Sequence, residues 1–588
     1  MVARSFISAK YQFADIPLIL KFTFFVEIIF WIPLAFIGFD AHHDGLILTT
    51  VHLTKDAIQS GSPWPFNQYG PAWVLIYSAI TWPLPSEWLF LSLRLITILS
   101  YLITGLLIWK IGTRFISNQG AFITMLVFFF SQPFVSNLGS DLVPWPSSIL
   151  MPIVAGVTLL SIRIIDFGKT NSVGVMTPFL NGLFVTILIF SRVQVGFAIL
   201  IIEIGICLFA GKRHICSFLF GLILGTSMLF SFLLKNGFLL DSLRDEFVFG
   251  ASYLSGDRSS YPKPLITFLG VAIFLVFLCL SSYVVRIISK YSAMDSLKKI
   301  VIFGLAFSVF LVTLAKLTPR YDLLELTTLA SRRIWISYFL AIIIYSAACS
   351  IAQTYWIFKE NHSIRSALNS RNLLVLISIA SQSQIFPLFD QMHFWWGSVP
   401  AVILVCLVTR EKLIELSLLS NLLPRKLFII SALPLCILLG LIPWMNQISQ
   451  TRTSFDMNIA RELYTEPELA TQEKKLQQFF SSSIAPGDSV LNLCENANVF
   501  FVNNSFKPSS RIFVLWANIA KDNSMVQELI ESRPNKVVTC SMNRIPNLQK
   551  ELEITQAKIV SKAMSDSYVV AQFSQATNLV WTIYANQN

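Results

Sequence analysis

Long apolar runs separated by short polar links make up the first 446 residues of the chain. A helix needs about 20 predominantly apolar residues to cross a bilayer. The pattern therefore predicts about thirteen transmembrane helices, and they begin near residues 17, 87, 118, 146, 174, 195, 214, 265, 299, 335, 372, 396 and 426. The first apolar run follows Arg4 and Lys10 as in a signal peptide, but no clean small-residue cleavage site follows, so we expect an uncleaved span.

The polar links fall into two sets that alternate along the chain. One set is basic, whereas the other carries less positive charge and more acids, aromatic residues and prolines. Basic links face the cytoplasm in membrane proteins. We therefore expect a cytoplasmic N-terminus, long outer loops and an extracytoplasmic C-terminus in a multi-pass protein of the inner (plasma) membrane. The basic links contain Lys110/Arg114, Arg163/Lys169, Lys212/Arg213, Arg286/Lys290/Lys298/Lys299, Lys359/Arg365/Arg371 and Arg410/Lys412/Arg425/Lys426.

Residues 447–588 have a different, more polar pattern that predicts a soluble domain. Short apolar segments alternate with polar helical stretches such as 523–533, which favours an α/β domain with a mainly parallel sheet. The fold class is thus an α-helical polytopic membrane module (1–446) with a C-terminal extracytoplasmic α/β domain (447–588). The expected strands are SVLNL (489–493), RIFVLW (511–516), KVVTC (536–540), AKIVSK (557–562), SYVVAQF (567–573) and LVWTIYA (579–585).

Composition supports the membrane class and excludes a nucleic-acid partner. Of the 588 residues, 54% are hydrophobic and only 13% are charged, against about 25% charged residues in soluble domains. The net charge of +11 sits in short inter-helix links, where it orients the protein in the bilayer. No C-x-x-C motif is present, and only Cys494 and Cys540 lie in the polar C-terminal region. A disulfide between them is geometrically possible, but two free thiols are the favoured expectation.

The segment FDAHHDGLILTTVHLTKDAIQSGSPWPFNQYGP (39–71) follows the first span and is the sharpest candidate for chemistry. Ile47, Val51, Thr54 and Ile58 share one face of a predicted helix that lies along the membrane interface. Gly-x-Pro at 61–63 should end this helix. Acids and histidines precede it, and interfacial aromatic residues follow it: Asp40, His42, His43 and Asp44, then Trp64, Phe66, Tyr69 and Trp73.

This arrangement resembles the C-type (GT-C) superfamily of polytopic membrane glycosyltransferases, which includes aminoarabinose transferases and protein O-mannosyltransferases. The resemblance begins with HHDG and Tyr69-Gly70-Pro71. It continues in order through PWPSS (144–148), SRVQVGF (191–197) and FDQMHFWWGSVP (389–400), and the C-terminal domain fits as well. It implies transfer of a sugar from a polyprenyl-phosphate donor to a glycan, lipid or protein acceptor outside the cytoplasm. The family's base is an acid of an early outer loop, which here is Asp44 first, then Asp40 and Asp141.

The residues themselves agree with this reaction. Displacing a lipid phosphate by a hydroxyl needs a carboxylate to take the proton and cations to hold the departing phosphate. Asp44 is ionised at neutral pH and stands at the expected place, although an N-cap of the following helix is the alternative role. Arg192 is the best cation, since charge at membrane depth is costly without a function, and headgroup snorkelling is its alternative. The further donor-phosphate candidates are His393, Arg258, Lys263, Arg332 and Arg333.

The remaining site residues are assigned to positioning the donor or the acceptor. They are His43, Tyr69, Gln194, Asp390 and Gln391. No metal site is assigned, because Asp40, His42, His43 and Asp44 lack ligand spacing, although a divalent cation could bind there.

Three other functions compete with the glycosyltransferase. A lipid or glycan transporter would bury charge within its spans, and Glu203 is the main candidate for that role. An O-antigen polymerase or ligase would concentrate polar chemistry in a late loop, whereas here the first loop is richest. A structural scaffold leaves the first-loop acids unexplained. The sugar, the acceptor and the polyprenyl type do not follow from the sequence.

Overall fold

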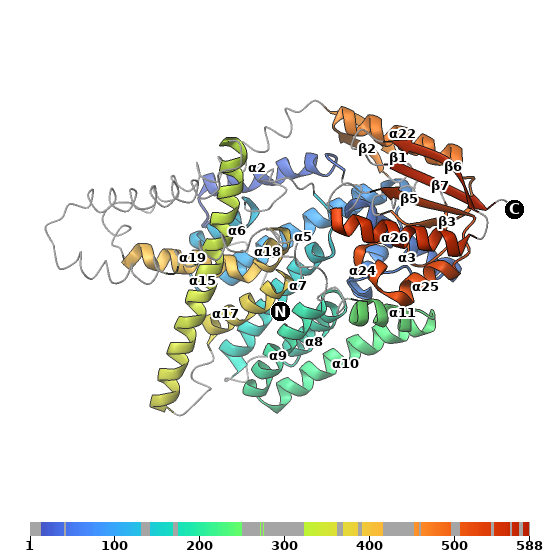
Figure 1. Ribbon diagram of the computed structural model, residues 1–588. Helices are drawn as coiled ribbons and strands as arrows, with labels where there is room; N and C mark the ends of the chain where they lie inside the picture. The colour runs from blue at the N-terminus through green and yellow to red at the C-terminus, as the bar shows by residue number, and fades with distance from the viewer. Residues whose placement is uncertain are drawn as a thin grey trace.

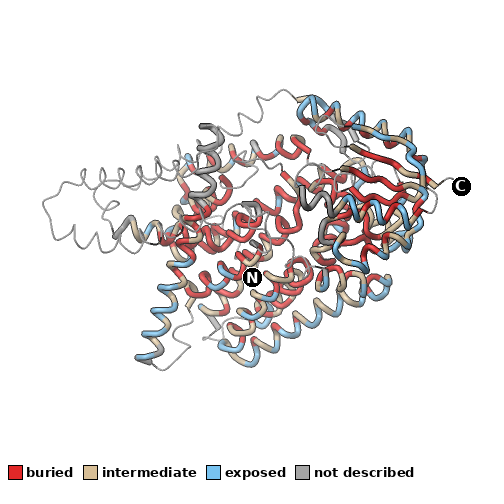
Figure 2. The backbone as a smooth tube through the Cα atoms, in the orientation of Figure 1, coloured by how far each residue is buried: buried red, intermediate tan, exposed pale blue. Residues whose placement is uncertain are grey.

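The protein forms a helical assembly that is joined to a C-terminal region with a β-sheet, as the computed structural model shows (Figure 1). Figure 2 shows that buried residues run through the helices and on into the sheet. The structure describes residues 13–39, 43–130, 142–168, 174–249, 271, 275, 323–361, 369–385, 391–415, 452–457, 460–494, 506–541, 546–564, 567–574 and 580–586.

The helical part contains elements at nearly every place where the sequence predicts a span. Every predicted span within the described residues coincides with a helix, whereas those expected near residues 265, 299 and 426 lie outside the described part. The helices are α2 (Leu18–Leu34), α5 (Leu89–Gly112), α6 (Asn118–Phe130), α7 (Pro146–Gly168), α8 (Met176–Ile189), α9 (Val193–Ala210), α10 (Lys212–Lys235), α15 (Leu323–Asn361), α17 (Ser370–Ser381), α18 (Gln391–Gly397) and α19 (Val399–Glu415).

Five helices of the described chain are long and apolar enough to cross a membrane. They comprise 86–112, 146–166, 193–210, 212–235 and 336–357. Large apolar side chains on α10 face outward, for example Phe220 at 62% exposure and Met228 at 65%. An apolar surface of this extent is unfavourable in water and suits a lipid environment. The chain is therefore an integral membrane protein.

The segment that follows α2 folds into two helices, one of which the sequence did not predict. The amphipathic helix α3 (His43–Ser60) ends directly before Gly61, whose φ is +71°, as the Gly-x-Pro signal predicted. The unpredicted helix α4 (Pro71–Thr81) starts with Pro71 at its first position, where a missing N–H costs nothing. The single-face prediction for α3 needs correction, because the helix is buried on all sides from Asp44 to Val51.

The C-terminal sheet is mixed, not mainly parallel as the sequence predicted. Its order is β4-β3-β5-β7-β6, with parallel β3–β4 and β3–β5 pairs and antiparallel β5–β7 and β6–β7 pairs. The strands are β3 (Ser489–Asn492), β4 (Lys507–Pro508), β5 (Lys536–Ser541), β6 (Ser567–Ser574) and β7 (Val580–Asn586). An unpredicted antiparallel hairpin, β1 (Thr453–Met457) with β2 (Ala460–Thr465), precedes this sheet.

Two of the strand predictions for this region are wrong. AKIVSK lies in helix α26 (Pro546–Ala563), and 512–516 has no regular structure although 513–515 are buried. Short apolar runs do not by themselves distinguish a strand from a buried helix or a buried extended segment. The expected helix at 523–533 is confirmed as α25 (Asn523–Glu531), which Asp522 caps by accepting hydrogen bonds from Ser524 N and Met525 N.

Helices cover both faces of the sheet, because its strands carry apolar side chains on both faces. Val538 packs with Leu476 and Phe480 of α22 (Pro467–Ser483), whereas its neighbour Val537 belongs to the core that includes Ile559 of α26. Successive strand residues point to opposite faces, so a strand that is apolar on both needs cover on both.

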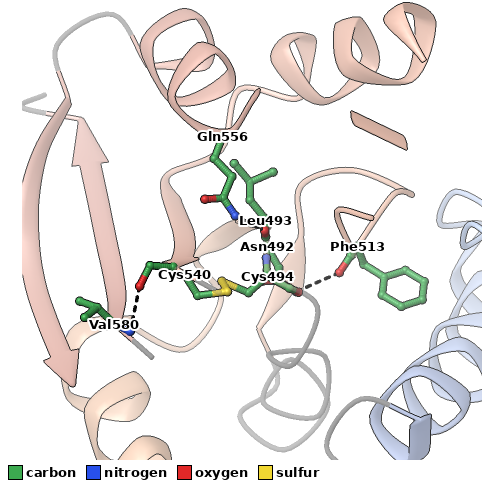
Figure 3. The surroundings of a disulfide bond; sticks show 8 residues. Asn492, Leu493, Cys494, Phe513, Cys540, Gln556 and Val580 are labelled. Atoms are coloured by element: carbon green, nitrogen blue, oxygen red, sulfur yellow. Dashed lines mark hydrogen bonds between the residues drawn. A yellow bond between two sulfur atoms is a disulfide. The ribbon is translucent and has the colours of Figure 1, made fainter. Parts of the chain in front are cut away.

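A disulfide joins Cys494 and Cys540 across the sheet, which overturns the expectation of two free thiols (Figure 3). Asn492 pairs with Val538 in the parallel β3–β5 register. Cys494 and Cys540 each lie two residues further along, so they stand opposite each other. Their Cα atoms are 5.5 Å apart, within the range that a disulfide requires.

The β1–β2 hairpin contacts the end of α2. Gly38 N donates to Tyr464 O at 2.9 Å, and Tyr464 N donates to Phe36 O at 2.8 Å. Backbone hydrogen bonds therefore join the C-terminal region to the segment between α2 and α3.

Candidate active site

Asp44 lies in the first turn of α3 and is fully buried, whereas the sequence analysis expected it in a loop. Its Oδ2 accepts a hydrogen bond from Arg94 Nη2 at 2.9 Å, and both side chains are 0% exposed. Because α3 begins at His43, Asp44 is inside the helix rather than at its N-cap. A carboxylate at this position also interacts favourably with the helix dipole.

Arg94 is a site residue that the sequence analysis missed. Besides Asp44, it donates to the carbonyls of Ile37 at 2.7 Å and Gly38 at 3.0 Å, and more weakly to Ala35 at 3.4 Å. It therefore joins α5, the end of α2 and the start of α3. The signal was available, since a single arginine within the apolar run LFLSLRLITIL is costly unless it has a partner.

The turn formed by residues 61–70, here called the 61–70 turn, presents Tyr69 between α3 and α4. Asn67 organises it: its Oδ1 accepts from Tyr69 N and Trp73 Nε1, each at 3.1 Å, and its Nδ2 donates to Gly70 O at 2.6 Å. Gly70 has a φ of +82°, a conformation that L side chains rarely adopt. The turn is thus fixed by side-chain hydrogen bonds on both sides of Tyr69.

Tyr69 connects a cation to a cluster of rings. The Arg192 guanidinium lies over the Tyr69 ring at 4.3 Å, and Arg192 Nε donates to Ser147 Oγ at 3.2 Å. The Tyr69 ring contacts Trp145 edge-on, with centroids 5.4 Å apart. Arg192 is 6% exposed, so this cation–π contact is largely desolvated, which strengthens it.

Trp145 is the centre of the cluster. Its ring contacts His43 at 5.1 Å and stacks on Trp396 at 5.8 Å with an interplanar angle of 10°. The Trp396 ring in turn contacts His393 at 5.1 Å. We call His43, Tyr69, Trp145, His393 and Trp396 the aromatic array. Its members and Arg192 lie in or directly before five helices, which are α3, α4, α7, α9 and α18.

The aromatic array brings together several residues that the sequence singled out separately. Asp44 follows His43 directly, and Arg192 lies on Tyr69. Gln194 stands two residues beyond Arg192, half-buried in the first turn of α9. The sequence analysis included Trp145 only within PWPSS and Trp396 only within FDQMHFWWGSVP, because a tryptophan side chain neither titrates nor binds metal.

Other predicted site residues cannot be placed. Asp40, Asp141, Arg258, Lys263 and Asp390 lie outside the described residues. The backbones of Arg332 and Arg333 belong to α15 and that of Gln391 to α18, while their side chains lie outside the description. Within the described part of the chain, no group of three or more His, Cys, Asp or Glu side chains is arranged to hold a metal ion.

Two acids that the sequence analysis did not select lie next to the 61–70 turn. Asp245 and Glu246 belong to the π-helix η2 (Arg244–Phe249), which follows α11 (Leu239–Leu243). Asp245 Oδ2 accepts from Asn67 N at 3.1 Å, and a Cβ atom on Gly70 would lie 2.5 Å from Glu246 Oε1. Burial raises the pKa of Glu246 well above its usual range.

No protein-family model matches the sequence, and no curated protein matches it. Among solved structures, the chain is similar to ArnT from Cupriavidus metallidurans bound to undecaprenyl phosphate. The identity is 12%, the TM-score is 0.38, and the match covers 95% of this chain and 96% of that chain. ArnT in the apo state gives 11% identity, a TM-score of 0.37 and the same coverage. A likeness at these values does not identify the activity or the substrate of the present chain.

Proposed function

We propose that the protein is a membrane glycosyltransferase that moves a sugar from a polyprenyl-phosphate-linked donor to an acceptor hydroxyl on the extracytoplasmic side. The observation that carries the proposal is the contact of Arg192 with the aromatic array, whose member His43 directly precedes the buried carboxylate of Asp44. A cation at membrane depth, a carboxylate and stacked rings are what a lipid phosphate, a hydroxyl and a sugar require.

In the proposed reaction, the acceptor oxygen attacks the anomeric carbon of the donor sugar as its proton passes to the Asp44 carboxylate. The bond from that carbon to the phosphate oxygen breaks, and the electron pair leaves with the polyprenyl phosphate. Arg192 and His393 stabilise the departing phosphate by charge and hydrogen bonding. Trp145 and Tyr69 offer ring faces on which the sugar could stack.

The extracytoplasmic side is proposed on two observations. The basic links alternate with acidic and aromatic ones, which supports an outer position for both the first loop and the C-terminal region. The Cys494–Cys540 disulfide lies in that C-terminal region, and disulfides persist in oxidising compartments.

The transporter alternative would depend on Glu203, and its surroundings support a different role. Glu203 is fully buried, accepts from Ser161 Oγ, and accepts from Asn181 Nδ2 at 2.8 Å. The three residues belong to α9, α7 and α8, so the hydrogen bonds join three adjacent helices. Polar contacts of this kind hold membrane helices together without requiring a transported ion.

Membranes that contain the full-length chain, incubated with a panel of polyprenyl-phosphate sugars, would test the proposal through donor consumption. We expect consumption of at least one donor and, for Arg192→Ala, an apparent KM that rises more than kcat falls. Arg371→Ala is the matched control, because Arg371 pairs with Glu411 at 2.8 Å away from the aromatic array, and its kinetics should stay at the wild-type values. The absence of consumption across the whole panel would contradict the proposal.

A further inference from the structure

A buried ion pair connects the C-terminal region to the turn that carries Tyr69. Arg511 Nη1 donates to both carboxylate oxygens of Asp245, at 3.0 and 2.8 Å, and Arg511 Nε forms an ion pair with Glu528 Oε1 at 3.0 Å. The side chains of Arg511 and Asp245 are 6% and 0% exposed. Arg511 lies before the buried 512–515 segment, whereas Asp245 belongs to η2, which follows the membrane helix α10.

The same pair holds two consecutive amides of the 61–70 turn. Phe66 N donates to the backbone carbonyl of Arg511 at 2.8 Å, and Asn67 N donates to Asp245 Oδ2 at 3.1 Å. Phe66 is 1% exposed and its ring contacts Trp516 at 6.1 Å. Two successive amides of the turn are therefore hydrogen-bonded, Phe66 N to the backbone of Arg511 and Asn67 N to the carboxylate of Asp245.

The hydrogen bonds of these amides also restrict the position of Tyr69, through the side chain of Asn67. Asn67 fixes the backbone of Tyr69 and Gly70 through its side-chain amide. On the far side of Tyr69, a methyl group on Gly70 would lie 2.5 Å from Glu246 Oε1 and 2.6 Å from the backbone oxygen of Phe190, so the turn packs closely against both. Asp245 and Glu246, adjacent in η2, thus bracket Tyr69 at Asn67 and Gly70.

We propose that Arg511 is a positioning residue for the donor site: it holds η2 and the 61–70 turn together and so orients Tyr69 beneath Arg192. The C-terminal domain is then a component of the site and not an appended unit. The kinetic part of this inference rests on the glycosyltransferase proposed above, whereas the structural part does not.

The charge balance makes this contact sensitive to the loss of Arg511. Three carboxylates face its guanidinium, since Asp241 lies 3.8 Å from Nε in addition to Asp245 and Glu528. Without the arginine, Asp245 would be a buried charge without a cationic partner, and its hold on Asn67 would weaken. Breaking a buried pair by removing one partner is strongly destabilising.

Hydrogen exchange of the full-length chain in detergent tests the structural part without any assay of activity. We expect Arg511→Gln to speed exchange of the Asn67 amide by about 10- to 100-fold, the equivalent of losing a hydrogen bond to a charged group. Exchange of the Phe66 amide should speed up less, because its acceptor is the backbone carbonyl of residue 511, which the substitution keeps. Peptides from α26 should keep wild-type protection. Arg244→Gln is the matched control: it removes contacts with Ser524 at 2.7 Å and Glu528 at 3.8 Å at the same interface, and it should leave the 61–70 turn unchanged.

Donor kinetics supply the second measurement. Arg511→Gln should raise the apparent KM for the donor about tenfold with a smaller change in kcat, and Arg511→Lys should restore part of the loss because it returns the charge without the planar fork. Equal exchange of the turn in Arg511→Gln and Arg244→Gln would overturn the inference, as would loss of protection in α26 together with the turn. If no donor is consumed by any form but the exchange result holds, the proposed function fails and the coupling of Arg511 to Tyr69 remains.

Discussion

Asp44–Arg94 and Asp245–Arg511 are both buried aspartate–arginine pairs, and they differ in what surrounds them. Arg94 shares its donors between one carboxylate and backbone carbonyls, and Asp44 is next to His43 in the aromatic array. Arg511 instead faces three carboxylates, and Asp245 accepts a backbone amide.

The difference shows that burial of an ion pair does not by itself identify catalytic chemistry. Both pairs are buried charges and would therefore be candidates for a functional site. Only Asp44 directly follows a member of the aromatic array, His43, whose ring contacts Trp145, and this favours Asp44 over Asp245 as the acid of the proposed reaction. Asp245 lies between Arg511 of the C-terminal region and the 61–70 turn, which is a structural position. The following variants separate these two roles.

The largest expected effect comes from Asp44→Asn. A general base contributes about 10²–10⁴-fold to the rate, so transfer should fall by about that factor, while Asn can still accept a hydrogen bond from Arg94. Asp245→Asn should change kcat by less than about tenfold, because it removes a holding contact and no proton acceptor. The measurement is donor consumption at saturating donor. Equal losses in both variants would remove the distinction between the pairs.

Arg94→Met should destabilise the helical part by about 3–5 kcal/mol, because it leaves Asp44 buried without its cation. Arg371→Met should cost no more than about 1 kcal/mol, since Arg371 and Glu411 are 39% and 35% exposed and water already solvates them. Thermal unfolding of both variants in detergent compares the costs. A melting temperature for Arg94→Met equal to that of Arg371→Met would show that the buried pair contributes nothing.

Glu473 of α22 sharpens the comparison because it is a buried acid that has no ion pair with Arg or Lys in the described structure. Burial raises the pKa of Glu473 to about 7 from 4.5. The folded state therefore holds a proton that the unfolded state has lost between these values, and stability should fall by about 3 kcal/mol as the pH rises from 4.5 to 7. Glu473→Gln should remove this dependence and stabilise the domain above pH 7. Parallel pH profiles of the melting temperature for the two forms would contradict the assignment.

The smallest effect is expected at Tyr69. Tyr69→Leu should weaken donor binding by about 1–2 kcal/mol, the contribution of a desolvated cation–π contact to Arg192. Tyr69→Phe keeps the ring face and should stay within about threefold of wild type. Donor affinity measured by quenching of tryptophan fluorescence distinguishes the two. Equal weakening by Leu and Phe would assign the effect to the hydroxyl group.

Much of the helical part could be predicted because the bilayer imposes a simple rule. Apolar runs of fixed length mark spans wherever they occur, so α5, α7, α9 and α10 begin within a few residues of their predicted starts. The stop of α3 followed equally from local chemistry at Gly61. The mixed order of the C-terminal sheet could not be predicted, because pairing between strands depends on contacts between distant segments.

The sequence determined which residue types stand in each link and are therefore candidates for chemistry: Asp44 and Tyr69 after the first span, Arg192 between two spans, and His393 before another. Residue type and hydropathy are local properties, so they can be read along one chain. Only the tertiary structure decided that Arg94 pairs with Asp44 and that Trp145 contacts both His43 and Tyr69. It also decided that Arg511 pairs with Asp245, which is 266 residues away in sequence. These contacts link segments far apart in sequence, and their geometry exists only once the helices and the sheet have packed together.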